Sequence, residues 1–149
     1  MHPFDPRSVL FARHAQHVVL IHFPIALCLV GVLFDFIGQW TKKPLLVDVA
    51  YYDLLLAAIS TLPVVMTGLL AWHWQLEGQR LKGVLLLHLV LGLTASGMIC
   101  LVWSLHFRAH RNPEAKLPLY RVPIELATAV VVSLTAHLGG FLSGVNGSG

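Results

Sequence analysis

Histidines are the residues of this sequence whose type and spacing could do chemistry. The chain has nine of them in 149 residues, and 56% of its residues are hydrophobic. Four histidines fall in or at the end of long apolar segments, one in each segment: His22, His73, His88 and His137. A polar, ionisable group in a membrane is costly and usually faces the interior of a helix bundle, where it marks a cofactor, ion or proton site.

The elements that must position these histidines are four apolar segments. Only 11% of the residues are charged, against about a quarter in a soluble domain, and a transmembrane helix needs about 20 apolar residues. The segments that qualify run over about 18–40, 49–74, 84–107 and 122–145. We therefore predict an all-α integral membrane four-helix bundle with short loops.

The domain organisation follows from these segments. The four helices form one domain over residues 17–145. Residues 1–16 are expected to lie at the membrane interface as a short surface helix, with Asp5 as N-cap and Pro6 at the first helical position. Residues 146–149 are a small, flexible tail.

The depth of the histidines is similar in the four predicted helices. His22 lies about 6 Å past the start of its segment and His88 about 6 Å past the start of the third, which begins on the same side of the membrane. His137 lies roughly 8 to 12 Å before the end of the fourth, which returns to that side. His73, at the exit of the second, lies nearer the surface. We expect the four imidazoles to gather toward one leaflet.

A b-type haem is the group that best explains imidazoles on facing helices, because its iron takes two axial nitrogens from opposite sides of the ring. The first hypothesis is therefore an electron-transfer subunit with haem b. His22, His88 and His137 are the first ligand candidates and His73 is the next, while His17, at the membrane mouth, is a further ligand or a supporting residue. One haem would use two of these histidines, and two haems would use four.

Other readings remain open. A chlorophyll magnesium needs a single histidine, and a zinc or copper ion would use three or four. Without any cofactor, the histidines would bond to neighbouring helices, and the protein would be an accessory subunit of a larger respiratory or photosynthetic complex. No catalytic residue is predicted, since the sequence has no nucleophile with a base, no paired carboxylates and no phosphate loop. We do not expect an enzyme.

The basic residues predict topology and not nucleic-acid binding. They lie in short stretches beside helix ends and form no extended patch. The first and third loops hold Lys42, Lys43, Arg108, Arg111, Lys116 and Arg121, and the other side holds Arg7, Arg13, Arg80 and Lys82. This excess predicts cytoplasmic first and third loops. Both termini and the histidines are then extracytoplasmic, and the expected partners are the lipid bilayer and other subunits of a membrane electron-transfer complex.

Acidic residues lie toward the opposite, cytoplasmic side. Asp35, Asp53 and Glu125 are near that membrane surface. Solvation at the interface, or pairing with residues such as Arg121, is the simpler interpretation. A proton path to a quinone is the alternative.

His2, His14, His106 and His110 are interpreted as solvated or headgroup-facing residues. His106 and His110 share one helix end, and no other helix offers a histidine at that depth. A second haem there is not expected, so this chain alone should not carry electrons across the bilayer.

Pro24 has no N–H to donate to the carbonyl of Leu20. The first helix therefore either begins near His22, with Pro24 in its first turn, or begins at His17 and kinks beside His22. Either arrangement fixes the direction of the His22 imidazole.

Several short motifs carry a resemblance to a known family. They are HFPIAL at 22–27, the pair Phe34-Asp35, Thr67-Gly68, His88, and HLGG at 137–140. With these motifs the chain resembles, over about residues 14–147, a bacterial family of predicted four-helix membrane proteins, the domain of unknown function 2231. The resemblance implies the fold, a bacterial inner membrane and a set of histidines to test, while haem binding is inferred from the histidines themselves.

Overall fold

A computed structural model describes residues 13–75, 80–112 and 117–143 of the chain. These residues form five helices and contain no strand. The helices are α2 (Arg13–Leu20), α3 (His22–Thr41), α4 (Pro44–Gln75), α5 (Gly83–Arg111) and α6 (Arg121–Leu142). Most of the expected surface helix over residues 1–16, and the tail over 146–149, lie outside the described residues.

Four stretches of helix are long and apolar enough to cross a membrane. They are Gln16–Thr41, Pro44–Trp74, Gly83–Arg111 and Arg121–Leu142. The prediction of a four-helix membrane bundle is confirmed. The second membrane-crossing helix begins at Pro44 and not near residue 49. The third ends at Arg111 and not near residue 107, because its polar end extends beyond the apolar segment.

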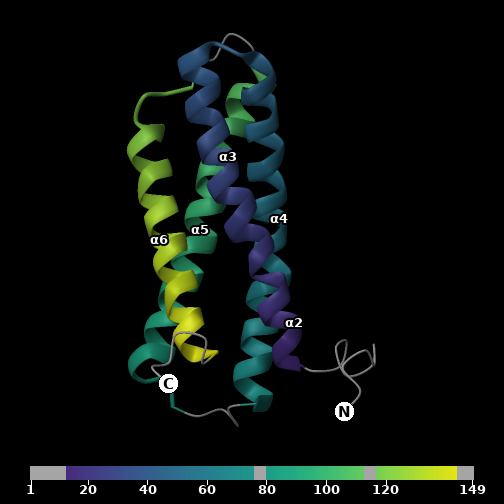
Figure 1. Cartoon of the computed structure of the whole chain (residues 1–149), viewed down its shortest axis with the longest axis vertical. Helices are drawn as coiled ribbons and strands as arrows, with labels where there is room; N and C mark the ends of the chain where they lie inside the picture. The colour runs from purple at the N-terminus through teal and green to yellow at the C-terminus, as the bar shows by residue number, and fades with distance from the viewer. Residues whose placement is uncertain (1–12, 76–79, 113–116, 144–149) are drawn as a thin grey trace.

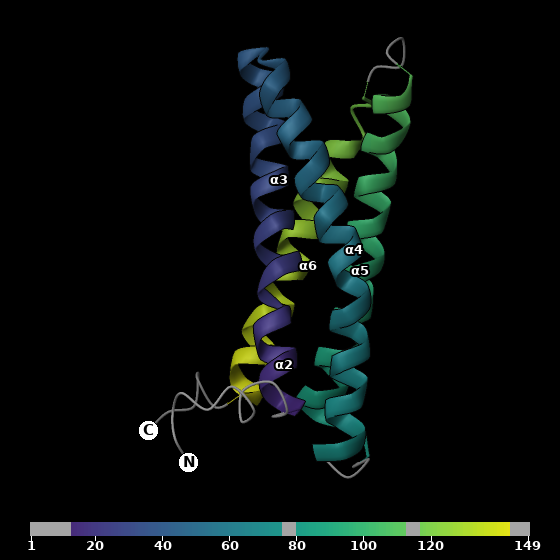
Figure 2. The same ribbon diagram turned by 90° about the vertical axis from the view of Figure 1, so that its right-hand side faces the viewer.

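The helices form a closed ring (Figures 1 and 2). α3 and α4 are joined by a tight turn and pack along each other, α5 packs on α6, and the ring closes through α4 against α5 and α3 against α6. The first helix, α2, packs mainly on α4. We call the end of the bundle that holds α2, the start of α5 and the end of α6 the α2 end. The other end holds the turn between α3 and α4, and we call it the loop end.

The interruption between α2 and α3 lies at Ile21. Pro24 has no N–H for the preceding turn, and the next backbone bond, from Ile25 N to Ile21 O, is 3.4 Å long. Pro24 therefore lies in the first turn of α3, and the chain before it forms a separate helix. The sequence predicted either a helix that begins near His22 or one that includes His17 and kinks beside His22. The structure has features of both, because α3 begins at His22 and His17 lies on the separate helix α2.

An apolar core fills the middle of the bundle, and lipid-facing side chains cover its outside. The core contains Cys28, Val32, Leu54, Ala57, Ala58, Ala95, Ile99, Val102 and Val132. Glycines bring α3 close to α4: a Cβ on Gly31 would lie 3.1 Å from Leu54 Cγ, and one on Gly38 would lie 3.0 Å from Val47 Cγ2. Small residues at such crossings are typical of membrane helix packing. The core separates two polar regions, one at each end of the bundle.

Candidate functional site

A cavity of about 540 Å³ lies at the α2 end of the bundle. All five helices contribute to its wall, where the ribbons of α3 and α6 diverge from those of α4 and α5 (Figure 2). The wall is mostly apolar, and it includes three histidines: His17, His22 and His88. A mostly apolar cavity of this size with a few converging polar groups is typical of a small-molecule or cofactor site.

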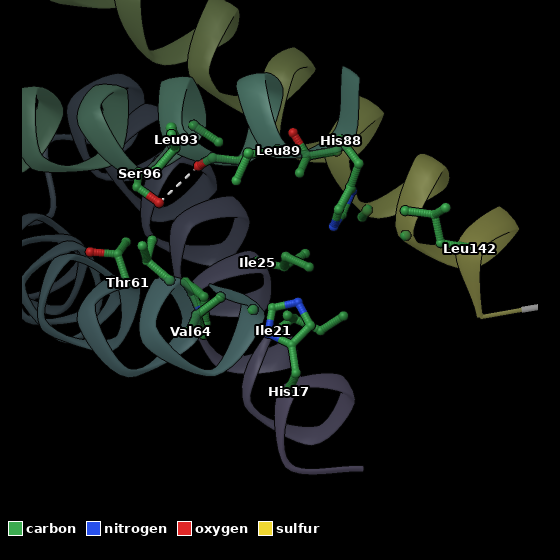
Figure 3. Close-up of a pocket in the computed structure, with 18 of the residues that line it drawn as sticks. His17, Ile21, Ile25, Thr61, Val64, His88, Leu89, Leu93, Ser96 and Leu142 are labelled. Carbon is green, nitrogen blue, oxygen red and sulfur yellow. Dashed lines mark hydrogen bonds between the residues drawn. The ribbon is translucent and has the colours of Figure 1, made fainter. Parts of the chain in front are cut away.

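His88 projects from α5 into this cavity (Figure 3). Its Nδ1 atom is buried and has no hydrogen-bond partner among the described residues. On the facing helix α6, a Cβ on Gly139 would lie 3.2 Å from His88 Cε1, so the imidazole lies close against a glycine. A buried nitrogen without a partner costs free energy, and a ligand in the cavity would relieve that cost.

His17 projects into the same cavity from α2 (Figure 3). Its Nδ1 lies 3.2 Å from Thr67 Oγ1 on α4. The Thr67 hydroxyl donates its own hydrogen to the carbonyl of Pro63, at 2.7 Å, so its oxygen accepts from the imidazole. This hydrogen bond fixes the orientation of the His17 ring against α4.

His22 lines the cavity from the start of α3, with its side chain exposed. Its Nδ1 is 2.7 Å from the carbonyl oxygen of Val18. A carbonyl only accepts, so Nδ1 donates and the lone pair of a neutral His22 is on Nε2. Metal-bound histidines in proteins usually donate their other ring nitrogen to a carbonyl or a carboxylate in this way.

The other two candidates, His73 and His137, do not line the cavity. Both side chains are exposed. The His73 ring lies 6.1 Å from the Trp74 ring, and the His137 ring meets Phe141 edge-on at 4.9 Å. Of the five histidines predicted as cofactor ligands, the structure brings together His17, His22 and His88.

A second polar cluster lies buried toward the loop end. Arg121 Nε and Nη2 donate to Asp35 Oδ2, at 3.0 and 2.9 Å. His106 Nε2 lies 2.9 Å from Glu125 Oε1, and Arg121 Nε is 3.6 Å from the same oxygen. Of the two simpler interpretations of Asp35 and Glu125, pairing with Arg121 is confirmed, and solvation at the interface is wrong, because both residues are 0% exposed.

The interpretation of His106 as a solvated residue is wrong. Its side chain is 2% exposed, because the bundle stays packed to this depth and Glu125 on α6 supplies a polar partner. Sequence reasoning missed this cluster as a unit. The sequence did contain a signal for it. Two acids, Asp35 and Glu125, lie at the depth of Arg121, and His106 lies at the same depth on another helix. His110, one turn further along α5, is exposed and stacks on Tyr51 at 4.1 Å.

Comparison with known proteins identifies a family to which the chain is similar, but it finds no relative with a described function. The profile of the family described as "Predicted membrane protein (DUF2231)" matches residues 13–149. No protein with a curated description and no solved structure matches the chain. The match spans all four membrane-crossing helices, so the chain belongs to this family of predicted membrane proteins, the domain of unknown function 2231.

Proposed function

We propose that this membrane protein is an electron-transfer subunit that binds a b-type haem in the cavity at the α2 end. The observation that carries the proposal is the convergence of three imidazoles on one mostly apolar cavity of about 540 Å³. The residues fit such a group: His88 Nδ1 is buried without a partner among the described residues, His22 donates through Nδ1 and so presents Nε2 to a metal, and His17 lines the same cavity.

His17 and His88 are the proposed axial pair. They enter the cavity from different walls, α2 and α5 (Figure 3), and a six-coordinate haem needs one imidazole from each side. His22, five residues after His17 and at the start of α3, is the alternative partner of His88. When bound, a bis-histidine haem supplies a one-electron couple with no open position for substrate.

The chain's own residues would hold this group and exclude water from it. Thr67 and the Val18 carbonyl fix the ring orientation of His17 and His22. The remaining wall is dominated by leucine, valine, isoleucine and small residues, which leave room for a flat, apolar ring.

A zinc or copper ion, or a chlorophyll, is the alternative occupant. The cavity residues include no aspartate, glutamate or cysteine, although such ligands often accompany histidine at zinc and copper sites. This donor set, made of imidazoles in an apolar wall, favours a tetrapyrrole. Between the two tetrapyrroles, a pair of opposed imidazoles favours iron over magnesium, which needs one.

The proposal includes the cellular setting. The excess of basic residues at the loop end favours a cytoplasmic position for that end, and the haem would then lie in the extracytoplasmic leaflet of a bacterial inner membrane. Its electrons would pass to or from other subunits of a membrane complex.

The test is the absorption spectrum of the protein purified in detergent from cells supplied with haem. We expect a reduced-minus-oxidised α band and b-type haem in a pyridine extract. His88→Ala and His17→Ala should each remove or convert the band, and the exposed, distant His110→Ala should leave it unchanged. A colourless intact protein would overturn the proposal and favour a cofactor-free accessory subunit.

His137→Ala and His22→Ala separate the possible ligand sets. His137 points outside the cavity in this structure, so its replacement should leave the band intact, whereas the sequence alone ranks it among the first ligands. If His22→Ala removes the band and His17→Ala does not, His22 is the partner of His88.

A further inference from the structure

The buried polar cluster toward the loop end has no part in the proposed haem site. It consists of Asp35 on α3, His106 on α5, and Arg121 and Glu125 on α6, and these residues are between 0% and 5% exposed. His106 lies 18 residues after His88 on the same helix, which places the two about 27 Å apart along α5. The cluster therefore needs its own explanation.

When His106 is neutral, the charges of this cluster do not balance without a further positive charge. Asp35 and Glu125 carry two negative charges when ionised, and Arg121 carries one positive charge. Arg121 donates both of its short hydrogen bonds to Asp35, and lies further, at 3.6 Å, from Glu125. A net charge buried within the membrane costs free energy. Because Arg121 neutralises Asp35, the negative charge of Glu125 is the one that still has to be neutralised.

A metal ion is one way to supply that charge. One ligand atom each from Asp35, His106 and Glu125 lie within 4.8 Å of one another. The Arg121 guanidinium, however, already holds Asp35 Oδ2, and the Gln39 amide donates to Asp35 Oδ1 at 3.3 Å. The positively charged Arg121 side chain therefore occupies the position from which a metal cation would bind Asp35. This arrangement disfavours a metal ion.

One proton also restores the balance, either on His106, where it would act on Oε1, or on the Glu125 carboxyl group itself. Glu125 Oε1 is engaged by His106 at 2.9 Å, whereas Oε2 is buried and has no partner among the described residues. An ionised oxygen in that position would have nothing to stabilise it. We propose that Glu125, oriented by His106 and Arg121, is a proton-binding site in the half of the membrane opposite the cavity, and that the proton resides on Oε2.

The surroundings of Glu125 are defined on every helix. α3 contributes Asp35 and the buried Cys28, α5 contributes His106, and α6 contributes Arg121. On α4, the buried titratable group is Tyr51, which stacks on His110 of α5. Exposed Gln39 bonds to Asp35 from the last turn of α3.

The experiment is infrared difference spectroscopy of the full-length protein in lipid, recorded across a pH series in H₂O and D₂O. We expect a carbonyl band of a protonated carboxylic acid that shifts in D₂O and disappears at high pH. Glu125→Gln should abolish this band, and His106→Gln should shift it by removing the hydrogen bond to Oε1. Asp53→Asn, which removes a half-buried acid on α4, should leave it.

Three outcomes would overturn the proposal. They are the absence of such a band at every pH, its persistence in Glu125→Gln, and stoichiometric Zn²⁺ binding that Glu125→Gln removes. The last would make the cluster a metal site. Haem content is measured in the same samples. Glu125→Gln should not change it, so the failure of this proposal and that of the haem proposal are distinguishable.

Discussion

The imidazole of His17 packs against the backbone of Gly68 so closely that a Cβ there would lie 2.9 Å from its Cε1 atom. Real Cβ atoms do not approach other atoms to that distance, so only glycine at this position permits the observed ring placement. Gly68 lies one residue after Thr67, whose oxygen accepts the hydrogen bond from the same ring. Two consecutive residues of α4 thus fix where the His17 imidazole lies and how it is oriented.

The first prediction concerns this contact. Gly68→Ala should displace the His17 ring and lower the haem content of the purified protein severalfold. The ring belongs to a side chain that can swing away, so the thermal stability of the protein should change little. Gly97→Ala is the matched control, because a Cβ at Gly97 on α5 would meet nothing within 4 Å. Equal haem-to-protein ratios in the two variants would contradict the assignment of His17.

A second prediction tests the hydrogen bond that orients His17. Thr67→Val keeps the side-chain volume of the residue and removes the oxygen that accepts from Nδ1. Loss of such a supporting bond typically costs about 10–100-fold in metal affinity, and a loss within that range is expected in a haem titration. Thr94→Val is the control, since the Thr94 hydroxyl bonds the carbonyl of Val90 on its own helix. A Thr67→Val protein that binds haem as tightly as the control would exclude this role.

The third prediction concerns the stability of the buried cluster. Arg121→Met removes the partner of Asp35 and leaves two acids buried, so the free energy of unfolding should fall by about 3–5 kcal/mol. The exposed Arg108, on the last turns of α5, provides the control variant Arg108→Met. Denaturant titration followed by helix content would measure both. If the two variants are equally stable, the ion pair between Arg121 and Asp35 contributes nothing to the fold.

The sequence predicted the fold well because the length and apolar character of four segments are local properties. It also predicted the depth of the histidines, since depth follows from counting along a helix. It could not predict how each helix is rotated. His137 and Gly139 are two residues apart on α6, yet Gly139 faces His88 and the cavity, while His137 contacts Phe141.

Long-range contacts explain the remaining differences between sequence and structure. His17 lines the cavity because α2 is a separate helix that packs on α4. His106 is buried because Glu125, 19 residues later, forms a hydrogen bond with it inside the bundle. Neither contact is visible in the local pattern of either segment.

The last prediction concerns Pro24. Its missing N–H interrupts the first membrane-crossing stretch at Ile21, between α2 and α3. Pro24→Ala supplies a donor for the carbonyl of Leu20, and a continuous helix would then carry His17 away from Thr67. We therefore expect haem content to fall although the helix content of the protein rises or stays constant. Pro44→Ala is the control, because Pro44 is the first residue of α4, where its N–H would have no partner within the helix. Full haem content in Pro24→Ala would mean that the separate α2 helix is not needed for the site, and would favour His22 over His17 as the partner of His88.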